Sequence, residues 1–405
     1  MSRSYLVSSD ADSLQVKAGL NAWMVAVRRH IHQYPELSFK EHNTAAFIQE
    51  KLDEHGLDYK SGIGETGVIC TIGDPQSSGP CVALRADMDA LPINEKTGLS
   101  FASGNPGIMH ACGHDGHVAM LLGAAALLRQ IPSIPGKIVL IFQPAEENGN
   151  GASRLVEEGV VDDVDAIFGG HIDTHYRTGQ ITVDHGIICA FSDPFKIKIC
   201  GKGGHAARPY EAIDVVVAAS SLVLMVQTLI SREVDPNKAE VITIGSFHAG
   251  TAPNVIAGEA TLQGTVRSTD KDTRIKTIDG LRRIVDSIAT MYDVDIELVF
   301  EEGLPAVINA RSATEIARTA AWKVASVDNV ISQGYPSLGG EDFAFYQQVT
   351  KGCMVRFGGA LGEGAGPSHS NTFDFDEKCL RYGAHWLAAV ALEWLRRSEP
   401  VVELS

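Results

Sequence analysis

The order of apolar segments along this chain of 405 residues strongly limits the folds that it can adopt. In the first half, short apolar runs typical of buried strands alternate with segments of helical periodicity. The runs lie at 68–72, 81–85, 137–142 and 166–168, with helical segments at 13–56, broken at Tyr34-Pro35, and at 116–130. The pattern resumes after Gly303, with helices at 312–324 and 380–395 and a strand at 354–357. This alternation predicts a doubly wound α/β domain.

The middle of the chain has a different order. Its segments are a strand at 195–200, a helix at 212–230, strands at 241–247 and 260–267, a helix at 274–292 and a strand at 294–300. The order β-α-β-β-α-β is that of a ferredoxin-like α+β domain. A chain of this length is expected to form two domains. We therefore predict an α/β domain made of residues 1–186 and 302–405, with a ferredoxin-like domain of residues 187–301 inserted in it.

Charge, apolar runs and cysteines limit the partners and the compartment. The net charge of −16 argues against nucleic acid or an anionic membrane as a partner. The longest apolar runs, such as 215–224, are shorter than the roughly 20 residues of a membrane span, and residues 1–12 lack the pattern of a secretory signal. The seven cysteines are odd in number and show no paired spacing. These features predict a cytoplasmic protein without a disulfide framework.

The run His110-Ala111-Cys112-Gly113-His114-Asp115-Gly116-His117 places a thiol, three imidazoles and a carboxylate within eight residues. Such a cluster is difficult to explain as core, because each buried polar group would need its own partner. Thiolate and imidazole are preferred ligands of zinc and similar borderline metals. The run therefore indicates a metal site.

Further polar groups follow the predicted strands of the α/β domain. Asp87 and Asp89 follow the strand at 81–85, the pair Glu146-Glu147 follows 137–142, His171 follows 166–168, and His369 follows 354–357. Functional groups in open α/β sheets gather beyond the carboxyl ends of the strands, so one edge could bring these groups to the Cys112 loop. A Glu-Glu pair is most often a solvated acidic loop, but beside a metal one glutamate can coordinate while the other accepts a proton. The set predicts a metal-dependent hydrolase.

Motifs along the whole chain carry a family resemblance. They are Arg28-Arg29-His30 through Pro35-Glu36-Leu37, Arg85 to Pro92, Met109 to His117, Pro144 to Glu147, Gly201 to Ala207, Asn254-Val255-Ile256 and Gly340-Glu341-Asp342-Phe343. In this order they resemble the metallopeptidase and amidohydrolase family of aminoacylases, carboxypeptidase G, hippurate hydrolase and the auxin-conjugate (IAA-amino acid) hydrolases. The greatest similarity is to the subfamily that has a cysteine among its metal ligands.

The resemblance implies a catalytic α/β domain with two divalent metal ions per subunit, manganese or zinc, with cobalt as a further possibility. The ligands that it implies are Cys112, His114, Glu147, His171 and His369, with Cys112 bridging both ions. It also implies that Glu146 is the general base and that Asp89 orients a ligand or the site loop without binding metal itself. The implied reaction is hydrolysis of an N-acyl amino acid or a similar small amide by metal-activated water.

The resemblance also assigns roles to the inserted domain. It implies a homodimer formed through this domain, with His205 reaching the partner's active site. Asn254 and Arg267 match positions that contact substrate, and Arg267 could pair with a carboxylate. Arg267 could instead belong to a charge pair on the strand surface, and the run Gly201 to Gly204 could be a simple hairpin loop.

Three departures from the family pattern leave other functions open. The glutamate pair is followed by Asn148-Gly149-Asn150-Gly151 instead of the usual glycine run. The residues after His171, 172–177, lack the usual prolines, and Ser368 stands where an apolar residue is more common. The same metal centre could serve a hydrolytic deaminase or a dipeptidase, although the signature of the zinc nucleobase deaminases is absent. A non-catalytic metal-binding relative is a third reading. Glu146 argues against it, because a protein that only binds metal needs no free base.

Overall fold

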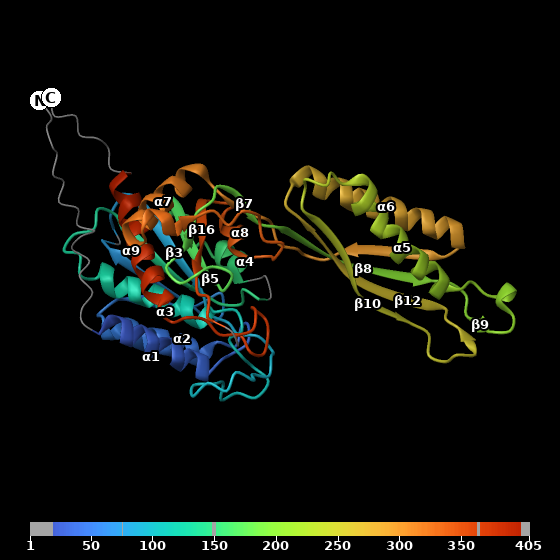
Figure 1. Cartoon of the computed structure of the whole chain (residues 1–405), viewed down its shortest axis with the longest axis horizontal. Helices are drawn as coiled ribbons and strands as arrows, with labels where there is room; N and C mark the ends of the chain where they lie inside the picture. The colour runs from blue at the N-terminus through green and yellow to red at the C-terminus, as the bar shows by residue number, and fades with distance from the viewer. Residues whose placement is uncertain (1–18, 75, 148–150, 363–364, 398–405) are drawn as a thin grey trace, which may run out of the picture. The chain divides into compact units, whose positions relative to one another are not determined.

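The computed structural model describes residues 19–74, 76–147, 151–362 and 365–397, so the N-terminal stretch tested for a secretory signal lies outside the described residues. Internal contacts divide the chain into two compact units (Figure 1). Unit 1 comprises Met1–Gly186, Ile308–Gly334 and Phe345–Ser405, and unit 2 comprises Ile187–Val307 and Tyr335–Ala344. Unit 2 thus extends beyond the expected range of 187–301, and a second segment of the chain returns to it. The separate functions expected for the two domains stay a prediction.

Unit 1 is built on an eight-stranded sheet with the order β1-β2-β4-β3-β5-β16-β6-β15. The strands are β1 (Tyr59–Ile63), β2 (Gly67–Gly73), β3 (Cys81–Asp87), β4 (Lys137–Gln143), β5 (Ala166–Asp173), β6 (Ile181–Thr182), β15 (Val330–Ile331) and β16 (Lys351–Gly358). The central strands β4, β3, β5 and β16 are mutually parallel. Every residue of β3 is buried, as expected for a strand covered on both faces.

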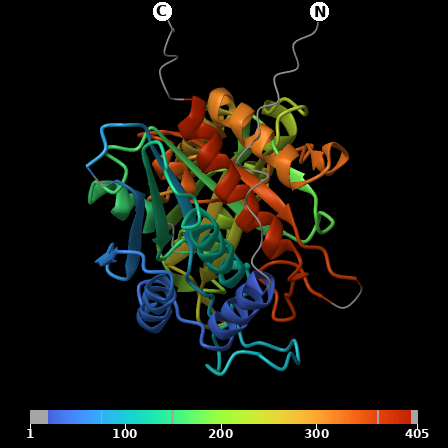
Figure 2. The same ribbon diagram turned by 90° about the vertical axis from the view of Figure 1, so that its left-hand side faces the viewer.

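Helices pack around this sheet. They are α1 (Leu20–Gln33), α2 (His42–Glu54), α3 (His114–Leu128), α4 (Gly151–Glu157), α7 (Arg311–Val324) and α9 (Cys379–Arg397), and a short α8 (Phe343–Tyr346) precedes β16. Helix α3 is buried along its whole length, because it packs between α1 and α9 and against β3 (Figures 1 and 2). Its mostly apolar sequence therefore shows little amphipathic pattern. The predicted α/β class is confirmed.

Unit 2 contains a four-stranded antiparallel sheet with the order β10-β12-β8-β13. Its strands are β8 (Phe191–Cys200), β10 (Glu240–Ala249), β12 (Glu259–Ser268) and β13 (Asp295–Phe300), and its helices are α5 (Val215–Glu233) and α6 (Lys271–Tyr292). Both helices cover one face of the sheet (Figure 1). A small ribbon of β9 (Gly204–His205) and β11 (Val255–Ile256) completes the unit. The strand order is that of the predicted ferredoxin-like domain.

Helix α5 is longer than the apolar run considered in the sequence. It has 19 residues, and by length and composition alone it could cross a membrane. Its buried residues, among them Leu222, Val226 and Leu229, belong to the core of unit 2. Packing on the sheet accounts for these buried residues, whereas other apolar residues of α5, among them Leu224, are exposed.

Two predicted boundaries differ from the structure at the site. Strand β5 continues to Asp173, so His171 lies within the strand rather than after it. The glycines Gly169 and Gly170, which weaken a strand prediction, are paired with β16. Helix α3 begins at His114, two residues before the predicted start at Gly116.

Candidate metal centre

The start of α3 presents Cys112 and His114 at the carboxyl edge of the unit 1 sheet. Gly113, the N-cap residue between them, has φ 93°, a left-handed conformation that glycine adopts without strain. This turn sends the Cys112 side chain and the first helical residue, His114, toward the same space. Both side chains are buried, with exposed fractions of 8% and 1%.

Five predicted ligands converge there. Cys112 Sγ lies 3.3 Å from His171 Nε2, and His369 Nε2 lies 3.4 Å from Glu147 Oε1. Two groups of three potential ligand atoms, each within 4.8 Å of one another, share the Cys112 thiol; they are Cys112, His114 and His171, and Cys112, Glu147 and His369. The arrangement has the form of two neighbouring cation sites bridged by a sulfur.

Two orphaned polar atoms test whether these residues fit a metal. Among the residues that the structure describes, His114 Nε2 and Glu147 Oε1 are buried without a hydrogen-bond partner. They lie 3.9 Å apart, and His114 Nε2 is also 3.9 Å from Glu146 Oε2. These separations are too long for hydrogen bonds, so each of these two buried atoms keeps a lone pair that a cation could accept. The donors therefore fit a divalent cation.

The protonation state of His171 suits metal binding, whereas Asp87 outweighs burial and raises the pKa of His114, and the hydrogen bond to Glu147 raises the pKa of His369. Burial holds the pKa of His171 well below its ordinary value, so the imidazole is neutral. Its Nδ1 bonds the carbonyl of Ile172 at 2.6 Å, which leaves Nε2 as the available lone pair. Burial raises the pKa of the Cys112 thiol to about 12 in the absence of a cation. A bound cation is thus what would stabilise the thiolate in this setting.

Asp89 holds the glutamate pair and His114 in place. Its Oδ1 accepts the backbone N–H of Glu146, and its Oδ2 accepts that of Glu147, both at 3.1 Å. The Ser38 hydroxyl donates to Oδ2 at 2.7 Å. His114 Nδ1 lies 2.9 Å from the Asp89 carbonyl and 3.3 Å from Oδ1. These contacts would let Asp89 orient His114 and both glutamates, and its role at the site stays a prediction.

The loop that carries the glutamate pair has a strained backbone. Ala145 has φ 54°, which is uncommon for a residue with a Cβ. Its N–H donates to the buried carboxylate of Glu41 at 2.9 Å, and Glu41 also accepts the Thr66 hydroxyl at 2.6 Å. Glu41 therefore fixes the turn that directs Glu146 and Glu147 toward the cluster.

His369 is presented in a similar way. It also has a left-handed backbone, with φ 65°. Its N–H donates to the carbonyl of Ala111 at 2.7 Å, one residue before Cys112. The loop that carries His369 is thus joined directly to the loop that carries Cys112.

His117 lies next to the cluster but has no free nitrogen. Its Nδ1 bonds Asp87 Oδ1 at 2.6 Å, and its Nε2 accepts the N–H of Ile172 at 2.8 Å. Arg85 holds the other oxygen of Asp87 at 2.5 Å. His117 and Asp87 therefore support β5 and the proposed ligand His171.

The remaining predicted residues belong to unit 2. His205 on β9 is exposed, and its Nδ1 accepts the N–H of Ala207 at 3.0 Å. Asn254 is also exposed, and it lies beside His205 because the Asn254 carbonyl accepts the N–H of Ala206. Arg267 lies near the far end of β12, opposite Ser192. Within one copy of unit 2, the structure thus brings Asn254 to His205 but does not bring Arg267 to them.

Arg267 makes no hydrogen bond or ion pair with any described residue, and burial lowers the pKa of its guanidinium. The nearest acidic group, Asp193, is instead paired with Arg274 at 2.5 Å. The alternative of a charge pair on the strand surface therefore finds no partner in the described part of the chain.

A buried charge network behind α3 was not expected from the sequence. His32 bonds Asp115 through Nδ1 at 2.8 Å and Glu95 through Nε2 at 3.3 Å. Burial lowers the pKa of His32, but these two hydrogen bonds outweigh it and raise the pKa to about 9. Arg28 binds Asp115 from the same helix at 2.8 Å. The motifs around Arg28 and Asp115 were visible in the sequence, but no local signal joined them.

Comparisons with known proteins agree with this arrangement. Residues 83–393 match the family described as peptidase family M20/M25/M40. The chain is 42% identical to thermostable carboxypeptidase 1 of Saccharolobus solfataricus, covering 91% of this chain and 95% of that protein. It is 39% identical to N-acetyl-L-cysteine deacetylase of Bacillus subtilis, covering 94% and 90%. The crystal structure of the YXEP protein of Bacillus subtilis, described as a dinuclear metal binding peptidase of family M20, superposes with a TM-score of 0.82 at 35% identity, covering 94% of this chain and 99% of that one.

Proposed function

This chain belongs to the peptidase family M20/M25/M40 and is a hydrolase of the metal-dependent peptidase and amidohydrolase class. On that basis we propose that it cleaves the amide bond of N-acyl amino acids. One observation carries the proposal. Two potential cation sites share the Cys112 thiol, and Glu146, which belongs to neither of these groups of three, lies beside His114. A carboxylate next to a metal centre is the arrangement that general-base hydrolysis requires.

Cys112, His114, Glu147, His171 and His369 would hold two divalent ions. Bound there, the ions would polarise the amide carbonyl and acidify a water molecule. Thiolate and imidazole favour zinc, while the carboxylate also admits manganese or cobalt.

Glu146 would accept the proton of the attacking water and return it to the leaving amine. Its side chain is 9% exposed, so the carboxylate lies at the inner wall of the site, where little bulk water competes for the proton. The hydrogen bond from the Glu146 N–H to Asp89 fixes the backbone that carries this carboxylate.

The proposed substrate class rests on two supports. The name of the deacetylase relative describes an N-acylated amino acid as its substrate, and Arg267 is a half-buried cation without a carboxylate partner in the described residues. A free α-carboxylate would supply that partner. A carboxypeptidase or dipeptidase is the second candidate, favoured by the carboxypeptidase relative, because its substrates present the same carboxylate beside the scissile amide.

We also propose that the enzyme is a homodimer in which His205 acts on the partner's substrate. His205 and Arg267 lie at opposite ends of the unit 2 sheet, about 25 Å apart by the rise of β12, so one small substrate cannot contact both within one copy of the unit. Helix α5 exposes Val217, Leu224 and Met225 by 49%, 71% and 46%, an apolar surface that a second copy would cover.

Substitution of the adjacent glutamates tests the proposal. We expect Glu146→Gln to abolish release of free amine from a panel of N-acyl amino acids and dipeptides while metal content stays near that of the wild type. We expect Glu147→Gln, the matched control, to lower metal content itself. A Glu146→Gln variant with unchanged turnover would refute the role of Glu146, and wild-type protein that cleaves only dipeptides would favour the second candidate.

Mixing two inactive variants tests the dimer. A His205→Ala protein combined with a Glu146→Gln protein forms some hybrid dimers with one intact site, so activity should partly return. If no activity returns although light scattering shows a dimer, His205 does not act on the partner's site.

A further inference from the structure

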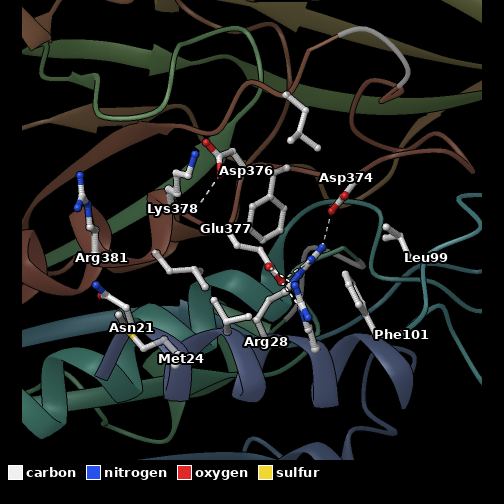
Figure 3. A pocket seen from close by; sticks show the side chains of 16 residues that line it. Asn21, Met24, Arg28, Leu99, Phe101, Asp374, Asp376, Glu377, Lys378 and Arg381 are labelled. Atoms are coloured by element: carbon white, nitrogen blue, oxygen red, sulfur yellow. Dashed lines mark hydrogen bonds and ion pairs between the residues drawn. The ribbon is translucent and has the colours of Figure 1, made fainter. Parts of the chain in front are cut away.

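Arg28 on α1 is a buried cation bound by carboxylates from two distant parts of unit 1. Its side chain is 1% exposed. Nε binds Asp115 Oδ2 at 2.8 Å, Nη2 binds Asp374 Oδ1 at 2.8 Å, and Nη1 binds Glu377 Oε1 at 3.1 Å. Figure 3 shows the guanidinium at the base of a pocket, pointing to Asp374 and Glu377. All five of its N–H groups belong to one rigid plane, so these bonds fix the carboxylates relative to one another.

The two segments that Arg28 joins are those that carry two of the proposed metal ligands. Asp115 directly follows His114 at the start of α3. Asp374 follows a loop that is closed by the bridge between Gly366 and Phe373 and has His369 near its tip. A shift of Asp374 would therefore move the base of the His369 loop.

Aromatic side chains hold the guanidinium in one orientation. Its Cζ lies 4.3 Å from the ring centre of Phe375 and 4.8 Å from that of Phe101. Burial alone would lower the pKa of Arg28, but Asp115 and Asp374 outweigh it and raise the pKa above its ordinary value, so the cation persists. An ammonium group could keep the charge but not the planar contacts with both rings and three carboxylates.

We propose that Arg28 is a positioning residue that sets the separation of His114 and His369, and so the affinity of the centre for its metal ions. The proposal rests on the proposed metal-dependent function. Arg28 itself touches neither ligand; it acts through Asp115 on one side and Asp374 on the other. Outer partners that orient metal ligands change metal affinity by about 10- to 100-fold when they are removed.

Arg29 provides a matched control on the same helix. It binds Glu377 through Nε at 2.9 Å and through Nη2 at 2.7 Å, and its Cζ lies 4.7 Å from the ring centre of Phe101. Its side chain is 46% exposed, and neither Asp115 nor Asp374 is among its bonded partners. Loss of Arg29 thus removes a similar ion pair without separating the two segments.

The experiment measures metal binding rather than activity. Wild-type, Arg28→Lys, Arg28→Met and Arg29→Met proteins are stripped of metal and titrated with Co²⁺ against a competing chelator, with the thiolate-to-cobalt absorption as the signal. We expect both Arg28 variants to bind Co²⁺ about 10- to 100-fold more weakly with an altered spectrum, and Arg29→Met to bind within about 3-fold of the wild type. Circular dichroism at the titration temperature confirms that each variant is folded.

Arg28 variants that are folded and bind Co²⁺ with wild-type affinity and spectrum would overturn the proposal while leaving the proposed function intact. Wild-type protein that binds no Co²⁺ would overturn the metal-dependent function on which the proposal depends. If Arg28→Met does not fold, Asp374→Ala removes the contact of Arg28 Nη2 on the His369 side. It should weaken Co²⁺ binding in the same direction, and wild-type affinity in this variant would likewise refute the proposal.

Discussion

Replacement of Asp89 by asparagine tests how the ligand geometry depends on a single carboxylate. The two oxygens of Asp89 accept the N–H groups of Glu146 and Glu147 at 3.1 Å each. An asparagine offers one oxygen and one NH₂ group, so one of these N–H groups would face a donor. The Ser38 hydroxyl can rotate to accept from the new NH₂ group, but a backbone N–H cannot. At least one charge-assisted hydrogen bond is therefore lost whichever way the amide is turned.

The lost bond sets the size of the effect. A hydrogen bond to a charged group contributes about 2 kcal/mol, which corresponds to roughly 30-fold in an equilibrium constant. We expect Asp89→Asn to weaken Mn²⁺ or Zn²⁺ binding by that factor, measured by competition with a chelator, and to lower kcat/KM in parallel. Ser38→Ala is the matched control, since it removes one donor but leaves the carboxylate intact, and it should change affinity by less than about 5-fold. Wild-type metal affinity in Asp89→Asn would show that the backbone holds the glutamates without Asp89.

Three other perturbations follow from the same structure. In the folded protein the pKa of His32 is raised to about 9 from an ordinary 6.5, so the contribution of His32 to stability is complete below pH 6.5 and is lost as the pH rises through 9. The unfolding free energy of the metal-free wild type should therefore fall by about 3 kcal/mol over that range. The unfolding free energy of His32→Asn should fall less. In Gly151→Ala the new Cβ would lie 1.7 Å from the carbonyl oxygen of Pro144, so the loop that carries the glutamate pair must move. A denaturant titration should show that the free energy of unfolding falls by about 3 kcal/mol, and the metal content should also fall. Cys112→Ser replaces a thiolate by a harder and weaker donor, so calorimetric titration should show a greater loss of affinity for zinc than for manganese.

The strands, and the convergence of the proposed ligands at one edge of the sheet, were predictable because their signals are local. The apolar run that became β4 and the pair Glu146-Glu147 after it lie together in the sequence, and so do the residues around Cys112. Parallel strands then bring their carboxyl ends to one edge, which converts sequence order into a spatial cluster. The position of His171 inside β5 was missed because Gly169 and Gly170 obscure the strand signal.

The supports of the site were not predictable in the same way. Glu41 binds the N–H of Ala145, which lies 104 positions along the chain, and Arg28 binds Glu377, which lies 349 positions away. Each of these residues, taken alone, looks like an ordinary charge near a helix. Their importance depends on tertiary packing, which no local pattern encodes.

The strained backbone explains why such supports are needed. Ala145 and His369 both have left-handed φ values beside the metal centre, and such conformations cost of order 1 kcal/mol each for residues with a Cβ. Without a partner, each loop would relax and its ligand would turn away. Glu41 accepts the Ala145 N–H, and Ala111 accepts the His369 N–H, so each strained turn is held by a hydrogen bond from a buried part of the fold. It follows that these hydrogen bonds help to hold the ligand loops in place, and that loss of Glu41 should reduce metal affinity even though Glu41 itself is not one of the proposed ligands.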